Sequence, residues 1–198
     1  MPKTKKLTPL EIENNIIFDL YLSGKDGNVP NNEDIEKVEK LLPSSLKLEK
    51  LEKNLKEKNY GIGADWPVVL IEWLNNNYLS ATLNFLSLVI IGKNVFNLIK
   101  DRPKEGNLIF LGVKSASYIG FYYINKNFPD KEFTLLSSIE IERGSFASKK
   151  EFVIIFTEKN SLHDNDPQLL ANADNSIFGE LIIIHLDWDG NLKSFYVY

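Results

Sequence analysis

Alternating apolar and polar positions near the N-terminus predict a strand. Ile16, Phe18 and Leu20 fall on one side of an extended chain, whereas Asp19 falls on the other. A period of two residues is typical of a strand with one buried face. We therefore expect a half-buried strand over residues 12–22.

The same alternation recurs in the C-terminal part of the chain. In one stretch, Ile182, Ile184 and Leu186 form an apolar face. A later Asp189-Gly190-Asn191 segment predicts a tight turn, since Gly and Asn tolerate the positive φ that such turns require. The pattern predicts four antiparallel strands, over Phe133–Glu142, Phe152–Glu158, Phe178–Trp188 and Leu192–Tyr198.

Helical spacing of apolar residues, together with capping residues, predicts helices in the middle of the chain. Trp66-Pro67 places a proline in the first turn of one of them, where proline is tolerated. A short strand or a turn is expected over Leu108–Val113. The expected helices run from Asn31 or Asn32 to Leu42, from Ser44 or Ser45 to Asn59, over 67–76, over about 78–100 and over Ser115–Asn127.

This order of elements predicts an α+β fold. An N-terminal strand and helices come first, central apolar helices follow, and a helix with a four-stranded antiparallel meander ends the chain. The segment Asp101–Gly106 is charged and contains both Pro and Gly, so it is the expected boundary. We expect either two regions, 1–105 and 106–198, or one continuous domain in which they share a core.

The C-terminal half resembles a known architecture. Its helix over Ser115–Asn127 ends in Asn127-Phe128-Pro129-Asp130, and a hairpin over Asp187–Leu192 closes the chain. This helix followed by a meander is similar to cystatin-like and PepSY-like domains over about the last ninety residues. Those families include peptidase inhibitors and binding modules. The resemblance therefore implies binding without catalysis.

Composition narrows the class of protein. Apolar residues make up 43% of the 198 positions, which is enough for a substantial core. The net charge of −4 argues against a nucleic-acid-binding protein, which needs a basic face. The chain has no cysteine, which excludes disulfides and Cys-zinc sites and fits a cytoplasmic location. Heavy use of Lys, Asn and Ile suggests a bacterial source, and the basic N-terminus leads into no signal-like apolar stretch.

An uncharged run from Trp73 to Gly92 has the length of a membrane span. It contains several Asn, Ser and Thr residues, and three adjacent Asn residues end at Asn77. Polar residues at these positions favour two buried helices over a span. We expect no membrane partner, and association through 73–92 is the minor alternative.

Histidine and aspartate residues form the strongest candidate for chemistry. His185, Asp187 and Asp189 alternate along a predicted strand, and His163 and Asp166 lie in the preceding polar stretch. Together they could hold a divalent metal through nitrogen and oxygen atoms, as in a metal-dependent hydrolase. The competing interpretation is that the aspartates only flank a turn, which Asp favours. We favour the second interpretation, so that no cofactor is expected.

Two further motifs predict no activity. Gly61-x-Gly63 lacks the third glycine of a dinucleotide-binding loop, and Asp65 would repel phosphate. No serine lies in a Gly-x-Ser-x-Gly context. We interpret the glycines as a turn.

Aromatic residues are the feature that points most to function. Any of them left on the surface would favour contact with a protein. The last strand is also a candidate sheet edge, which could accept a partner strand. We therefore expect a non-catalytic component of a bacterial system, of the inhibitor, immunity or adaptor type, that binds another protein. The acidic balance suits a basic partner. The candidate contact residues are Tyr118, Tyr122, Phe195, Tyr196 and Tyr198.

Overall fold

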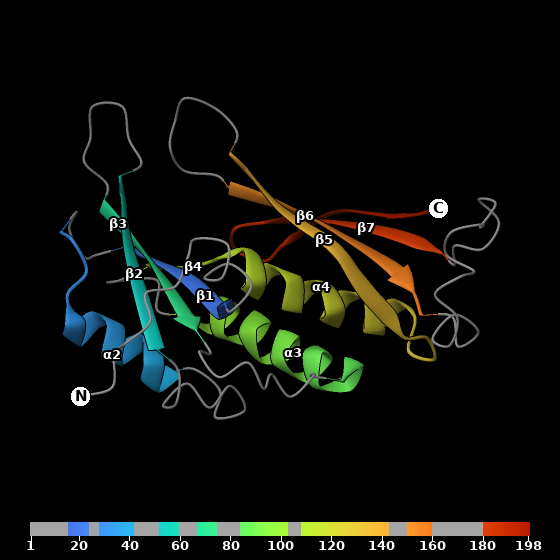
Figure 1. Cartoon of the computed structure of the whole chain (residues 1–198), viewed down its shortest axis with the longest axis horizontal. Helices are drawn as coiled ribbons and strands as arrows, with labels where there is room; N and C mark the ends of the chain where they lie inside the picture. Colours follow the sequence, from blue (N-terminus) through green and yellow to red (C-terminus); the bar gives the residue numbers. More distant parts are fainter. Residues whose placement is uncertain are drawn as a thin grey trace, which may run out of the picture.

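The computed structural model describes residues 16–23, 28–41, 52–59, 67–74, 84–102, 108–142, 150–159 and 180–198. Within them, three helices and two antiparallel four-stranded sheets form an α+β fold, as predicted (Figure 1). The elements are β1 (Ile16–Ser23), α2 (Asn32–Leu41), β2 (Glu52–Asn59), β3 (Pro67–Leu74), α3 (Phe85–Asp101), β4 (Leu108–Leu111), α4 (Val113–Asn127), β5 (Phe133–Glu142), β6 (Lys150–Glu158), β7 (Leu181–Asp187) and β8 (Leu192–Val197).

The first sheet has the strand order β2-β3-β1-β4. In its centre, β1 pairs antiparallel with β3, so that Asp19 lies opposite Glu72 and Tyr21 opposite Leu70. Every residue from Phe18 to Ser23 is buried, so both faces of β1 are covered. The strand predicted at the N-terminus is confirmed, but the expectation that only one of its faces is buried is wrong.

Two strands of this sheet occupy positions where helices were predicted. The helix predicted up to Asn59 is wrong over 52–59, which is β2, and the helix predicted over 67–76 is wrong over 67–74, which is β3. Because β3 is buried on both faces, it shows a continuous apolar run, which periodicity cannot distinguish from a buried helix. The charged residues of β2 have good helix propensity, but pairing with β3 along the whole strand overrides it.

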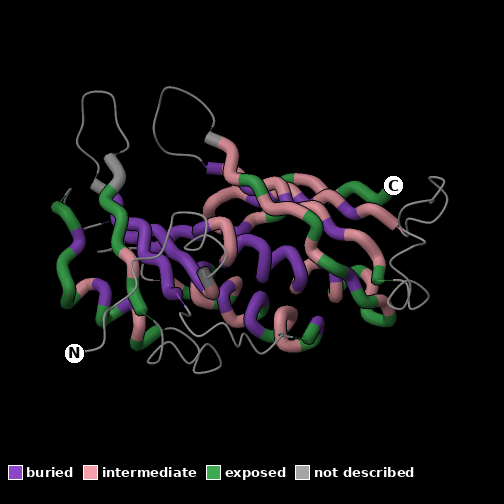
Figure 2. Tube along the Cα trace, viewed as in Figure 1, coloured by how far each residue is buried: buried purple, intermediate pink, exposed green. Residues whose placement is uncertain are grey.

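The second sheet is a meander with the strand order β5-β6-β7-β8, and the four predicted C-terminal strands are confirmed. Buried and partly exposed residues alternate along β6 and β7, because one face packs inward. Figure 2 shows the contrast with β1 and β3 of the first sheet, whose buried stretches are continuous. Helix α4 packs against β5 and β6.

Helices α3 and α4 run side by side, next to the second sheet (Figure 1). A side chain at Gly92 of α3 would collide with the backbone of Tyr118 in α4, so glycine permits this close approach. Helix α3 begins at Phe85, after Asn84 accepts a hydrogen bond from the Ser87 amide. The predicted helix over about 78–100 is confirmed from residue 85 onward. Within the described residues, none of the helices is both long and apolar enough to cross a membrane.

One buried apolar cluster joins residues of both sheets and all three helices. Trp73 of β3 and Phe156 of β6 both belong to it and are fully buried. The predicted boundary at Asp101–Gly106 lies mostly outside the described residues. The division into 1–105 and 106–198 stays a prediction.

Candidate functional site

The predicted metal-site residues do not converge where they are described. His163 and Asp166 lie outside the described residues, as do the Gly61-x-Gly63 motif and Asp65. The Nε2 atom of His185 lies 2.9 Å from Oε2 of Glu151. In the described residues, no three histidine or acidic side chains gather in a way that could hold a metal ion.

The two aspartates next to the last turn have structural partners. The carboxylate of Asp187 accepts hydrogen bonds from the Asp189 amide, the Asn191 amide and the Asn191 side chain. Asp189 forms an ion pair with Arg102, at 2.8 Å between Oδ1 and Nη2. Gly190 has the positive φ expected of the turn, 73°. The turn interpretation accounts for the contacts of Asp187, and Asp189 in addition links the turn to Arg102 after α3.

The predicted aromatic contact residues divide between the interior and the surface. Tyr118 is only 7% exposed, and its hydroxyl donates to the carbonyl of Ile17 at 2.6 Å. Burial raises the pKa of this hydroxyl to about 12. It is therefore largely an interior residue, and its role as a partner contact stays a prediction.

The other four aromatic residues lie closer to the surface. Tyr122 and Phe195 are partly buried, against Phe96 and Phe128 respectively. Tyr196 and Tyr198 are 52% and 71% exposed. They lie on and just after β8, which is an edge of the second sheet as predicted.

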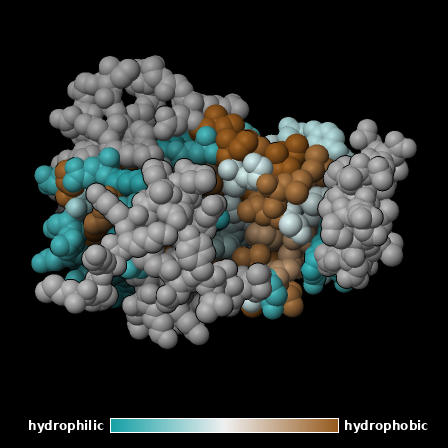
Figure 3. Space-filling view, in the orientation of Figure 1, coloured by the Kyte–Doolittle hydropathy of each residue, from teal (hydrophilic) through white to brown (hydrophobic). Residues whose placement is uncertain are grey.

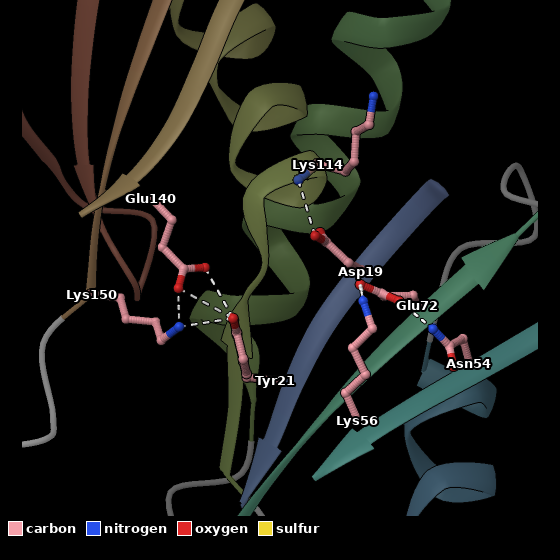
Figure 4. A network of polar contacts seen from close by, with 8 residues as sticks. All are labelled: Asp19, Tyr21, Asn54, Lys56, Glu72, Lys114, Glu140 and Lys150. Atoms are coloured by element: carbon pink, nitrogen blue, oxygen red, sulfur yellow. Dashed lines mark hydrogen bonds and ion pairs between the residues drawn. The ribbon is translucent and has the colours of Figure 1, made fainter. Parts of the chain in front are cut away.

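A buried polar network that the sequence did not reveal begins at Asp19 of β1 (Figure 4). Its carboxylate accepts hydrogen bonds from the backbone amides of Lys114 and Ser115, at 3.2 and 3.0 Å. Helix α4 has Gly112 at its N-cap and no capping side chain of its own. Asp19 of strand β1 therefore caps this helix from a distant part of the sequence. A side chain at Gly112 would collide with that carboxylate. Burial raises the pKa of Asp19 to about 6, although the two amide hydrogen bonds act in the opposite direction.

The network continues on both sides of Asp19. Next to it, the buried carboxylate of Glu72 accepts from Asn54 at 2.7 Å and from Lys56 at 2.8 Å. Further along β1, the hydroxyl of Tyr21 donates to Glu140 of β5 at 3.0 Å.

A lysine completes the connection between the two sheets. Lys150 of β6 donates to the Tyr21 hydroxyl at 2.8 Å and forms an ion pair with Glu140. Both Tyr21 and Lys150 are buried. The carboxylates of Asp19 and Glu72 already accept two hydrogen bonds each, and their side chains are closed to solvent. We interpret the network as a structural tie between the sheets. Its sequence signal is an acidic residue inside an otherwise apolar strand.

A pocket of about 670 Å³ lies between α3, α4 and β5. Such a volume and a mainly apolar lining are typical of ligand sites. Of the network residues drawn in Figure 4, only Lys114 also lines the pocket. The lining residues are Asn84, Phe85, Leu86, Leu88, Lys114, Ser117, Tyr118, Phe121, Glu132, Phe133, Thr134, Leu135 and Lys159.

Exposed apolar side chains lie on two of the elements that form this pocket, and one of them, Leu86, lines it. Leu86 and Ile90 of α3 are 62% and 56% exposed, and Leu136 of β5 is 56% exposed. Figure 3 shows a hydrophobic surface that extends over β5 and the helices on this face. The sequence carried one signal for it, since Leu86 and Ile90 are four residues apart and share a helix face.

The charges of the pocket are unequal at its two ends. At one end, Oε2 of Glu132 lies 3.9 Å from Nζ of Lys159, so the charges of these two side chains balance each other. Lys114 forms no ion pair with another described residue, and its side chain points away from Asp19 (Figure 4). Neither α3 nor α4 has an acidic residue in its first turn. The Lys114 end is positive through the ammonium group of Lys114, because the N-terminus of α4 is already capped by the carboxylate of Asp19.

Comparison of the chain with protein families, with curated proteins and with solved structures finds no match in any of the three.

Proposed function

We propose that this protein is a non-catalytic binding component of a bacterial cell, of the inhibitor, immunity or adaptor type, and that it holds another protein at the pocket between α3, α4 and β5. The observation that carries this proposal is the pocket with the exposed side chain of Leu86 in its lining, together with exposed Ile90 and Leu136 on α3 and β5, two of the elements that form it. Exposed apolar residues that adjoin a pocket are typical of sites where a partner excludes water.

The rest of the molecule supports binding over catalysis. The described candidate residues for chemistry, such as His185 and Asp187, are engaged in pairs and turns. Asp19 and Glu72 of the buried network are closed to solvent. The predicted likeness to cystatin-like and PepSY-like domains agrees with a binding role and remains a proposal of the same kind.

The test is a quantitative capture experiment with the tagged full-length chain in lysate of its source organism. The Leu86→Glu variant places a charge at the pocket margin, in the first turn of α3, where an acidic residue is compatible with the helix. Tyr196→Glu is the matched control, because it places the same charge at an exposed aromatic position on the opposite edge of the sheet. The captured protein is then purified, and its affinity for each variant is measured by calorimetry.

We expect L86E to weaken binding of the purified partner at least tenfold, which is about 1.4 kcal/mol. Y196E should leave the affinity within about twofold, which corresponds to only about 0.4 kcal/mol. The opposite pattern, with loss in Y196E and retention in L86E, would move the binding site to the β8 edge. Equal affinity of all three proteins would overturn the proposal.

A further inference from the structure

We infer that the pocket receives an extended peptide segment of the partner, which adds as a strand to the open edge of β5 and directs a carboxylate toward Lys114. This inference rests on the proposed function and specifies the kind of segment that is bound. Three observations support it: the position of β5 in its sheet, the shape of the adjoining pocket and the charge at one end.

The backbone of β5 has an open side at the pocket. In the described residues, β5 is an edge strand whose only strand neighbour is β6. The carbonyl of Glu132 accepts from the Lys159 amide at 2.7 Å, so the backbone of Glu132 faces β6. Since backbone groups alternate in direction along an antiparallel ladder, those of Phe133 and Leu135 face the open side. Both residues line the pocket.

The open side is limited to the first half of β5. Further along, the hydroxyl of Ser117 donates to Ser138 at 2.8 Å, and Glu140 is held by Tyr21 and Lys150. A β-bulge interrupts the pairing of β5 with β6 between Leu135 and Ser137. It lies where the open part of the β5 edge ends. An added strand can therefore pair with residues 133–136 and end near the bulge.

The pocket provides space for the side chains of such a strand. Its floor runs from Lys114 to Phe121 of α4, which is about 10 Å along a helix axis. That length corresponds to about three residues of extended chain. Successive side chains of a strand point to opposite sides, so one or two apolar side chains would enter between Phe85 and Phe133. A groove between an edge strand and a helix is an established geometry for binding peptides by strand addition.

Charge selects the chemistry at one end of the segment. Lys114 lies at the pocket and forms no ion pair with another described residue. A carboxylate of the segment would complement this end, whereas the Glu132–Lys159 end is already balanced. The net charge of −4 favours a partner that is basic as a whole, but the local charge decides which segment docks.

The test uses random seven-residue peptides displayed on phage. They are selected on the immobilised full-length protein and counter-selected against L86E. We expect enriched sequences with apolar residues at alternate positions and one Asp or Glu. A selected peptide is then synthesised, together with copies that carry a single N-methyl group at each backbone amide in turn, and with a copy in which Asn or Gln replaces the acid.

Two results would support the inference when affinities are measured by calorimetry. N-methylation at alternate positions should weaken binding more than tenfold, because those amides pair with β5. Lys114→Met should weaken the acidic peptide about fivefold, which is about 1 kcal/mol, and should leave the neutral copy unchanged. Lys93→Met, on the exposed side of α3, is the matched control and should change neither.

The failures of the two proposals are distinguishable. One outcome is that the partner loses affinity with L86E but not with K114M, and that no peptide is enriched that binds the native protein and not L86E. Strand addition is then overturned, while the pocket remains the binding site. Enriched peptides whose affinity is insensitive to N-methylation would also overturn it, since they would bind without backbone pairing. If L86E has no effect on the partner, the proposed function itself fails.

Discussion

The central strand β1 of the first sheet and the β7–β8 turn of the second sheet use polar side chains in different ways. In the first sheet, Asp19 and Tyr21 are buried and contact residues about a hundred positions away in the chain, namely Ser115 and Glu140. At the end of the second sheet, Asp187 contacts its own turn, four residues away. Long-range polar contacts tie separate elements together, whereas local contacts shape a single turn.

This difference teaches where the fold depends on specific partners. A strand covered on both faces needs its polar side chains satisfied in the interior, because an unpaired buried polar group costs free energy. Asp19 and Glu72 satisfy this requirement through backbone amides, Asn54 and Lys56. A strand with one solvated face, such as β7, has no such requirement for its outward residues.

The largest effect is expected for Lys150→Met, which removes the cation between the sheets. Glu140 and Tyr21 would lose a charged partner in a buried site, so the free energy of unfolding should fall by between about 3 and 5 kcal/mol. Urea denaturation at pH 7 measures it. The control is Lys53→Met, whose exposed pair with Glu39 should be worth less than about 1 kcal/mol. Equal losses in the two variants would show that the connection between the sheets is energetically unimportant.

The difference between strands buried on one face and strands buried on both faces explains which parts of the fold could be predicted. The second sheet followed from the sequence, because burial of one face gives clean alternation, as at Ile182 and Ile184. Strand β3 did not, because burial on both faces makes Val68–Leu74 uniformly apolar except at Glu72. The charged strand β2 depends on pairing with β3, which a local pattern does not contain.

The candidate site was less predictable than the fold. Its lining comes from three elements, with Leu86 in α3, Lys114 in α4 and Phe133 in β5. Only tertiary packing brings these positions together, so neither spacing nor composition could identify the pocket. The exposed aromatic residues at the C-terminus were identified correctly as part of an edge, but Tyr118 was not recognisable as buried.

The next effect in size concerns the pH dependence of stability through Asp19. Its pKa is raised from 3.8 to about 6 in the folded state, so the folded protein binds a proton more tightly than the unfolded chain. This contribution to stability is fully present below pH 3.8 and is lost as pH rises toward 6. The loss amounts to at most about 3 kcal/mol.

The measurement compares Asp19→Asn with the native protein in urea titrations from pH 4 to pH 7. Asn does not titrate, so the stability of the native protein relative to D19N should decline over this range. Asp130→Asn, at the exposed turn after α4, is the control. A native-minus-variant difference that is constant with pH would contradict the assignment to Asp19.

The smallest effect is expected for Asp187→Ala, at the turn between β7 and β8. Three hydrogen bonds are lost, but the donors become accessible to water, so the free energy of unfolding should fall by only about 1 kcal/mol. Urea denaturation under the conditions used for K150M places the buried network and the β7–β8 turn on one scale. A loss as large as that of K150M would remove the distinction between local and long-range contacts.

The same variant also tests the metal-dependent alternative, in which Asp187 acts with His185 and Asp189. We expect calorimetric titration of the native protein with Zn²⁺ to show no binding that D187A abolishes, because each of these side chains already has a partner in the structure. Stoichiometric Zn²⁺ binding that is lost in both D187A and His185→Ala would reverse this conclusion. It would mean that the metal displaces Glu151 from His185 and opens the turn, and the β7–β8 end would then replace the pocket as the leading functional site.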